Sequence, residues 1–146
     1  MEEKHLPAII DLLDGADSAV RYWGVMGLLF QGKSGYAYGK QKLHRALKDH
    51  SPYVAITAAE VFGKFGSEEE QSEALKVLSR YIDPVENGIY LSILALNAIN
   101  LEDEKIKILF PKIQTIPDRL KGVHGRTSRY PGSLKRMILE QFNQNL

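Results

Sequence analysis

The sequence predicts an all-α protein, an α-solenoid built of about four helical hairpins. Apolar residues recur with the period of an amphipathic helix almost throughout the 146 residues. No run of alternating apolar and polar residues is long enough to predict a sheet. The third observation is a repeat, because one helical pattern returns after 34 residues and again after 37. A period in this range is typical of stacked helix–turn–helix units.

The first hairpin is expected at residues 3–32. The apolar face of its first helix consists of Leu6, Ile9, Ile10 and Leu13. Gly15 is expected to end that helix, and Asp17 or Ser18 to cap the next one. Gly32 then ends the second helix.

The second hairpin is expected at residues 40–66. A segment rich in glycine and tyrosine predicts a loop before it, at Gly35, Tyr36, Tyr38 and Gly39. The hydroxyl of Ser51 is expected to cap the second helix of this hairpin. Pro52 suits the first helical position, where no N–H is needed, and Gly66 ends the helix.

Residues 67–101 and 104–146 are expected to form the third and fourth hairpins. Ser67 and Glu70 have the spacing of a capping box, in which the serine oxygen accepts from the amide of Glu70. The acidic residues at this helix start favour its dipole and are interpreted as a solvated face: Glu68, Glu69, Glu70 and Glu73. The fourth hairpin is less regular and ends with a helix around Leu134.

The repeat appears when the second helices of the first three hairpins are aligned. Val20, Val54 and Leu91 then coincide. Four residues further on, each helix has a small residue, where two helices must approach closely: Gly24, Ala58 and Ala95. We therefore expect one solenoid domain over residues 1–146. The alternative is three unrelated amphipathic hairpins in an ordinary bundle, which have no reason to share this small-residue position.

Composition excludes several classes of protein. The chain has no cysteine, so disulfides, thiol nucleophiles and thiolate metal sites are excluded. The 19 Lys and Arg nearly balance the 18 Asp and Glu. No stretch of about 18 apolar residues is present that could cross a membrane. The first residues do not have the pattern of a signal peptide.

Residues 27–34 match the phosphate-binding loop pattern, with Gly27, Gly32, Lys33 and Ser34 at its fixed positions. That chemistry needs a flexible loop between a strand and a helix N-terminus. Here the helical period continues into the match and places Gly32 to Ser34 at the C-terminal end of a helix, where carbonyls are exposed. We interpret the match as accidental and expect no nucleotide cofactor.

No catalytic or metal-binding constellation is found. The histidines have no partner at a ligand spacing: they are His5, His44, His50 and His124. No serine lies in a Gly-x-Ser-x-Gly elbow. We therefore expect a chain without enzymatic activity, bound metal or cofactor.

Arg21, Tyr22 and Trp23 lie in the first turn of a helix, just after Asp17. In stacked repeats, an aspartate in a turn and an arginine in the first helical turn pair within or between units. Trp23 is the only tryptophan and faces either the core or the edge of the stack. The three residues therefore either order the turn by packing or contact a partner surface.

The C-terminal part of the chain concentrates positive charge. Residues 119–139 contain no acid but seven basic side chains: Arg119, Lys121, His124, Arg126, Arg129, Lys135 and Arg136. Residues 122–132 have no helical period and predict a long loop. Such a loop either binds an anion (phosphate, a sulfated glycan or an acidic protein face) or is simply solvated. Nucleic acid is disfavoured because the earlier hairpins carry no basic stripe.

The hairpin pattern resembles the HEAT-like, armadillo-type repeat family. More narrowly, residues 18–28 resemble the first repeat of the helical region that follows the catalytic domain in many bacterial sulfatases. Residues 51–60 resemble its second repeat and residues 94–99 its third. The resemblance covers roughly residues 5–101.

The resemblance implies a non-catalytic accessory domain, C-terminal to a sulfatase (sulfuric ester hydrolase) domain of the same parent chain and packed against it. No catalytic residue carries over, because the sulfatase nucleophile begins a Cys/Ser-x-Pro-Ser/Ala-Arg motif, which neither Ser51 nor Ser128 does. As such a fragment, the chain would be periplasmic or extracellular. The alternative is a freestanding scaffold that binds a protein on the concave face formed by the second helix of each hairpin.

Overall fold

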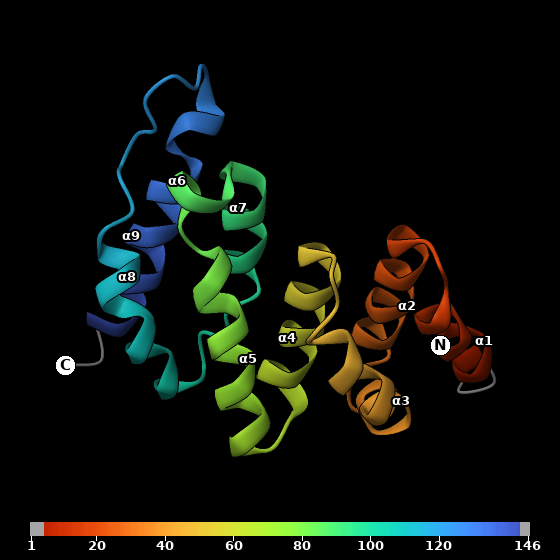
Figure 1. Ribbon diagram of the computed structural model, residues 1–146. Helices are drawn as coiled ribbons and strands as arrows, with labels where there is room; N and C mark the ends of the chain where they lie inside the picture. Colours follow the sequence, from red (N-terminus) through yellow and green to blue (C-terminus); the bar gives the residue numbers. More distant parts are fainter. Residues whose placement is uncertain (1–4, 144–146) are drawn as a thin grey trace. The chain divides into compact units, whose positions relative to one another are not determined.

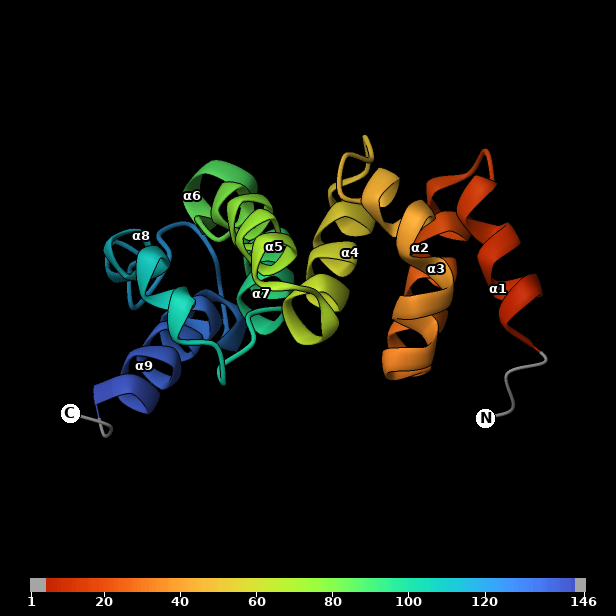
Figure 2. The same ribbon diagram turned by 90° about the horizontal axis from the view of Figure 1, so that it is seen from below.

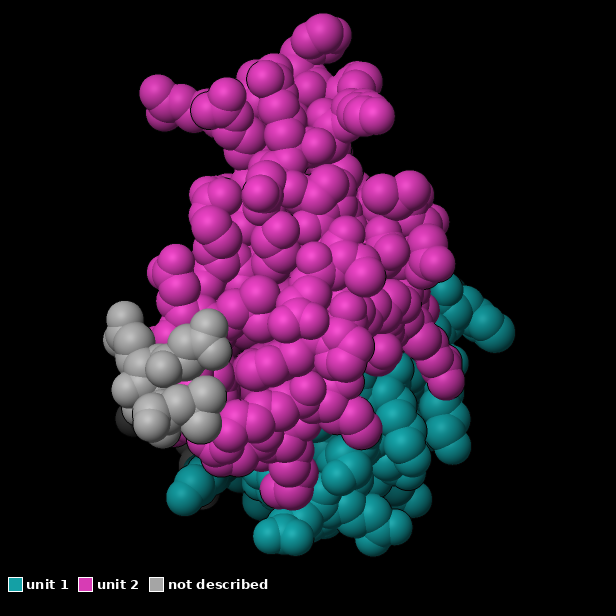
Figure 3. All heavy atoms as spheres, turned by 90° about the vertical axis from the view of Figure 1, so that its left-hand side faces the viewer, with its two compact units in different colours: residues 1–77 teal, residues 78–146 magenta. Residues whose placement is uncertain are grey.

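The computed structural model describes residues 5–143, which form helices joined by short segments, without a strand in that range. The all-α fold class predicted from the helical period is confirmed. The chain divides into two compact units, residues 1–77 and 78–146, which Figure 3 distinguishes by colour.

The first unit is built from hairpins in chain order (Figure 1). Its elements are α1 (Leu6–Asp11), the 3-10 turn η2 (Leu12–Asp14), α2 (Ser18–Phe30), α3 (Gly32–Ala46), α4 (Pro52–Phe65) and the start of α5 (Glu68–Tyr81). Helix α1 packs on α2, and α2, α3 and α4 pack on one another (Figure 2). The largest fully buried side chains of this unit are Val25, Leu28, Leu43, Ile56 and Phe62. Helix α4 is the most enclosed element, since eight of its fourteen residues are buried.

The second unit contains the end of α5 and a less regular set of elements. These are α6 (Pro84–Asn87), α7 (Ile89–Asn97), η3 (Glu104–Leu109), α8 (Phe110–Gln114), η4 (Arg126–Arg129) and α9 (Tyr130–Asn143). Helix α9 packs on α7 and α8. Its core includes Ile82, Leu96, Ile106, Ile113 and Ile138.

The predicted start of α2 is confirmed. The carboxylate of Asp17 accepts a hydrogen bond of 2.8 Å from the amide of Ala19, which is the N-cap bond. Gly24 marks a close helix contact, because a Cβ there would lie 2.6 Å from the Cδ1 atom of Leu13. This contact explains the small residue at that position of the repeat.

The predicted cap of α4 is wrong in one respect. Pro52 takes the first helical position, but the hydroxyl of Ser51 makes no capping bond. The carboxylate of Asp49, which also accepts from Arg21, accepts from the Ser51 amide at 2.9 Å and orders the turn before the helix.

The loop predicted at residues 35–39 is also wrong, because α3 already begins at Gly32 and runs through this segment. Gly35 and Gly39 are buried against α2. A Cβ on Gly35 would lie 2.1 Å from the carbonyl oxygen of Leu28, and one on Gly39 would lie 2.3 Å from the Leu28 Cδ1 atom. The two glycines therefore permit close helix packing and do not break the helix.

Candidate functional site

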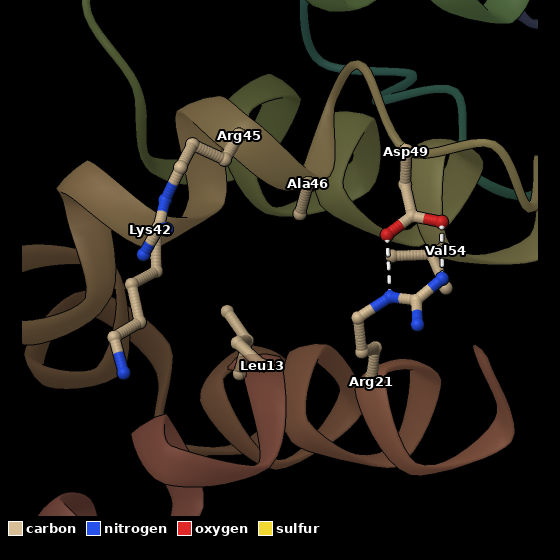
Figure 4. Close-up of a pocket in the computed structure, with 7 residues that line it drawn as sticks. All are labelled: Leu13, Arg21, Lys42, Arg45, Ala46, Asp49 and Val54. Carbon is tan, nitrogen blue, oxygen red and sulfur yellow. Dashed lines mark hydrogen bonds and ion pairs between the residues drawn. The ribbon is translucent and has the colours of Figure 1, made fainter. Parts of the chain in front are cut away.

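Arg21 of α2 joins two successive hairpins (Figure 4). Its Nε donates to Asp49 Oδ2 at 2.7 Å, and its Nη2 to Asp49 Oδ1 at 2.9 Å. Its Nη1 donates to the carbonyls of Gly15 and Ala16, each at 2.9 Å. Of the two roles expected for Arg21, these bonds support the ordering of a turn. Its carboxylate partner is Asp49 in the next hairpin and not Asp17.

The pair borders a small hollow of about 70 Å³ between α2, α3 and the turn after α3. Figure 4 labels its lining residues, which are Leu13, Arg21, Lys42, Arg45, Ala46, Asp49 and Val54. The two cations at its other end already form ion pairs with the carboxylate of Asp14, Lys42 at 2.6 Å and Arg45 at 3.3 Å. The hollow is too small for an organic ligand, and its charges are paired within the protein.

Tyr22 lines a surface hollow, and Trp23 is exposed to solvent. Tyr22 is half-buried and lines a hollow of about 200 Å³ with Tyr53. The two rings of Tyr22 and Trp23 meet edge to face, with centroids 5.4 Å apart. Trp23 is 62% exposed, which places it at the edge of the stack and not in the core.

Trp23 belongs to an exposed apolar surface that we call the α2 face: Val20 (39% exposed), Trp23 (62%) and Phe30 (68%). Trp23 and Phe30 follow Val20 by three and ten positions in the same helix, so the three side chains lie on one side of it. Arg21 is the only charged residue of α2, and its charge is taken up by Asp49. The α2 face is therefore both apolar and uncharged.

The position of α2 in the stack explains why Trp23 is exposed. In the repeat register, Trp23 corresponds to Thr57 of α4, which is 1% exposed. Helix α4 is covered by α2 of the preceding hairpin, whereas in the described part of the chain α2 is preceded only by α1 and η2 of its own hairpin. In the same register Val20 corresponds to Val54, which is fully buried, and Phe30 to Lys64, which is exposed. The register therefore places Val20 and Trp23, but not Phe30, at positions that a neighbouring helix covers in α4.

Glu70 has several polar partners in the first unit, and neither its burial nor its partners on α3 were predicted from the sequence. Its side chain is 7% exposed, so the expectation that it belongs to a solvated face is wrong. The Oε2 atom accepts from the Tyr36 hydroxyl at 2.6 Å and from the Ser67 amide at 2.8 Å. The Oε1 atom lies 2.9 Å from Lys40 Nζ and 3.0 Å from His44 Nε2.

We call Glu70 and its partners Tyr36, Lys40, His44 and Ser67 the Glu70 cluster. Two features of the sequence indicate it. Tyr36, Lys40 and His44 are spaced by four residues, so they form one line along α3. The capping box turns the Glu70 side chain back toward the helix start, and its serine bond is confirmed at 3.3 Å from the Glu70 amide to Ser67 Oγ. Joining the two features requires knowing that α3 extends through residues 36–44.

The chemistry of the Glu70 cluster suits a structural role. Burial would raise the pKa of Glu70, but the bonds from Tyr36, the Ser67 amide and Lys40 outweigh burial and lower it from 4.5 to about 2. A carboxylate with that pKa stays ionised at neutral pH and cannot serve as a general acid. Because an ionised carboxylate only accepts hydrogen bonds, His44 donates from Nε2.

The seven basic residues singled out in residues 119–136 separate into three groups. Lys135 and Arg136 of α9 share Asp118, at 2.7 Å and 3.7 Å from its Oδ1 atom. Lys121 and His124 are exposed in the preceding segment. The remaining three line a hollow of about 280 Å³ together with one glycine: Arg119, Gly125, Arg126 and Arg129.

The predicted long loop at residues 122–132 is shorter than expected, because η4 starts at Arg126 and α9 at Tyr130. Two bonds order the segment: the Ser128 hydroxyl donates to the Gly125 carbonyl at 2.8 Å, and the Leu120 amide donates to the Ser128 carbonyl at 2.8 Å. A single 3-10 turn held in this way leaves no apolar period in the sequence.

The residues that match the phosphate-binding loop pattern do not all belong to the helix predicted for them. Helix α2 ends at Phe30, and Gly32, Lys33 and Ser34 begin α3 instead of ending α2. The start of a helix is the electropositive end, so the reason given above does not hold at these three residues. The loop itself is nevertheless absent, because Gly27 to Phe30 are helical and only Gln31 separates the two helices.

Two further observations concern the described residues 5–143. Nowhere among them do three His, Asp or Glu side chains gather closely enough to hold a metal ion. None of their helices combines the length and the apolarity that crossing a membrane requires.

Comparison with known protein families gives a match to HEAT repeats over residues 6–97. Comparisons with curated proteins and with solved structures find no match. The matched segment runs from α1 to the end of α7, covers more than half of the chain and includes the three aligned helices. The chain belongs to the HEAT-repeat family and forms an α-solenoid of helical hairpins.

Proposed function

We propose that the chain is a non-catalytic docking domain that binds a protein partner through the α2 face. The observation that carries this proposal is the exposure of Trp23 and Phe30 on a helix whose only charge is already paired. Clustered exposed apolar side chains mark interaction sites, and aromatic anchors supply much of the energy of protein interfaces.

The proposed partner is the catalytic domain of a sulfatase-type hydrolase in the same parent chain. The resemblance of residues 18–28, 51–60 and 94–99 to the helical region of bacterial sulfatases supports this assignment. The placement of the α2 face also supports it. Val20 and Trp23 correspond to residues that are buried in α4, so a preceding element could cover them, and in those sulfatases the catalytic domain precedes the helical region.

The coding sequence upstream of residue 1 tests the identity of the partner. We expect it to encode a hydrolase domain with the Cys/Ser-x-Pro-Ser/Ala-Arg nucleophile motif. A reading frame that starts at Met1 would overturn the sulfatase assignment and favour the freestanding scaffold. Hydrolysis of an aryl sulfate by the purified chain alone would contradict the non-catalytic role.

Binding measurements test the docking surface itself. Calorimetric titration of the separately produced hydrolase domain should give an affinity that Trp23→Ala with Phe30→Ala lowers at least ~100-fold, as for interface hot spots. Tyr90→Ala is the matched control, because Tyr90 is 71% exposed on α7 and lies outside the α2 face. An equal loss from Tyr90→Ala, or no loss from the double variant, would contradict docking through α2.

A further inference from the structure

We propose that Arg119, Arg126 and Arg129 form a binding site for a tetrahedral oxyanion, the phosphate or sulfate group of a small ester. The three side chains, with Gly125, line the hollow of about 280 Å³ in the second unit, which we call the arginine hollow. The site is independent of the proposed docking role, because it uses none of the residues of the α2 face.

The backbone around the arginine hollow brings distant residues together. The Leu120 amide donates to the Ser128 carbonyl at 2.8 Å, which places their neighbours Arg119 and Arg129 on the same small surface. Ser128 is fully buried, and its hydroxyl holds the Gly125 carbonyl at 2.8 Å. Leu120 is 9% exposed. The arginines therefore project from an ordered segment.

A close backbone contact fixes the base of the same segment. Gly132 of α9 lies against Asp118, and a Cβ on that glycine would lie 2.6 Å from the Asp118 Cα atom. Gly125, by contrast, has a φ of +77° and nothing within 4 Å of where its Cβ would be. A side chain other than hydrogen is strained at that φ, so this backbone conformation favours glycine.

Charge balance distinguishes these three arginines from the other cations of the region. Within residues 5–143, none of the three side chains makes an ion pair or a hydrogen bond, whereas Lys135 and Arg136 share Asp118. Residues 119–139 contain no acid that could serve instead. Three guanidinium groups around one hollow repel one another, and a bound anion removes that repulsion.

The chemistry of the lining indicates the kind of anion. A guanidinium presents a rigid fork of N–H donors that matches two oxygens of a phosphate or a sulfate at once. Three forks suit a tetrahedral group with several oxygens better than a carboxylate with two. The open side of the hollow leaves room for the organic part of an ester.

The test is a titration with inorganic phosphate, inorganic sulfate and pyrophosphate, with acetate as the control anion, followed by NMR of the arginine side-chain N–H groups. We expect the three tetrahedral anions to shift the signals of the three arginines and acetate to shift them much less. A phosphate ester and a sulfate ester, titrated separately, identify which source binds more tightly.

Variants separate a defined site from diffuse attraction. Arg129→Gln and Arg126→Gln should each weaken pyrophosphate binding at least ~10-fold, the loss expected for a charge-assisted hydrogen bond. Lys121→Gln is the matched control, because Lys121 is exposed in the same segment but does not line the hollow. Its affinity should change less than ~2-fold. Thermal unfolding of each variant confirms that it folds.

Three outcomes would overturn the proposal. Equal losses from Lys121→Gln and Arg129→Gln would mean that net charge, not the hollow, attracts the anion. Acetate binding as tightly as phosphate would exclude recognition of a tetrahedral group. Affinity for an oligonucleotide that rises with its length, without binding of the small anions, would indicate a nucleic-acid surface instead.

Discussion

Glu70 ties the start of α5 to α3 through side-chain contacts that span more than twenty residues of sequence. Its two oxygens accept from a hydroxyl, an amide and an ammonium group, and His44 completes the set. The rings of Tyr36 and His44 also rest on Phe62, with centroids 5.9 Å and 4.7 Å away. A buried charge that is satisfied in this way specifies one arrangement of the helices.

The lowered pKa of Glu70 predicts a pH-dependent stability. Because its pKa is about 2 in the folded chain and about 4.5 when unfolded, its contribution is complete above pH 4.5 and is lost as the pH falls toward 2. Urea unfolding at neutral pH should show Glu70→Gln to be less stable by about 2–3 kcal/mol, a difference that shrinks over that window.

Glu69→Gln is the control for this prediction, because Glu69 is exposed in the same helical turn. It should match the wild-type stability at neutral pH within ~0.5 kcal/mol. A Glu70→Gln variant whose deficit stays constant from neutral pH to pH 2 would show that lost packing, and not the ionised carboxylate, causes the effect.

At Arg21 we expect stability to depend on the shape of the side chain and not only on its charge, because its guanidinium makes four hydrogen bonds with fixed geometry. Arg21→Lys keeps the charge but loses the fork that fits Asp49 and the two carbonyls. Thermal unfolding should therefore give a midpoint roughly 5 °C below the wild type for Arg21→Lys. Arg45→Lys, which changes an exposed pair with Asp14, should leave the midpoint nearly unchanged. Equal midpoints for the two variants would contradict the role given to Arg21.

At the scale of elements, the contact between α2 and α3 depends on the absence of side chains. The carbonyl of Leu28 occupies the place of a Cβ on Gly35, so one residue of α3 rests on the backbone of α2. Such a contact cannot widen for a methyl group unless a helix moves.

Gly35→Ala should therefore destabilise the chain by at least ~2 kcal/mol in urea unfolding, although alanine favours an isolated helix by ~1 kcal/mol. Gln41→Ala on the exposed side of α3 provides the comparison and should change stability by less than ~0.5 kcal/mol. A stabilised Gly35→Ala variant would mean that a Cβ fits at residue 35, which would contradict the close contact between α3 and the backbone of α2.

The elements also show which parts of the fold follow from sequence. The apolar period located α2, α4 and α9, because these helices bury one continuous face, and a cap at Asp17 located the start of α2. They did not locate the start of α3, where Gly35 and Gly39 act as packing residues although glycine is usually read as a helix breaker. Burial of Glu70 was missed for a related reason, since its partners lie on that unrecognised part of α3.

For the candidate sites, sequence identified the residues but not their grouping. The sequence shows that residues 119–136 are basic, yet only the structure shows that Asp118 pairs with Lys135 and Arg136 and that three arginines line one hollow. The sequence does not decide whether Trp23 faces the core or the edge of the stack, because a helical period cannot tell which faces of a repeat have a neighbour. That depends on where α2 stands in the stack.

At the scale of the whole molecule, the chain presents two surfaces of different chemistry, one in each compact unit. The α2 face in residues 1–77 is apolar and uncharged, and the arginine hollow in residues 78–146 is cationic. Repeat proteins commonly use exposed helix surfaces for binding, and their buried faces hold the stack together. The docking role therefore depends on the state of Trp23 in the free and the bound chain.

Fluorine NMR of the chain labelled with fluorotryptophan measures that state directly, because Trp23 is the only tryptophan and gives a single signal. In the free chain we predict a solvent-exposed signal. Addition of the unlabelled hydrolase domain should shift it, and Phe30→Asp should abolish the shift. A signal typical of a buried tryptophan in the free chain would contradict docking through the α2 face. A signal that stays unchanged while the hydrolase domain binds would contradict it as well.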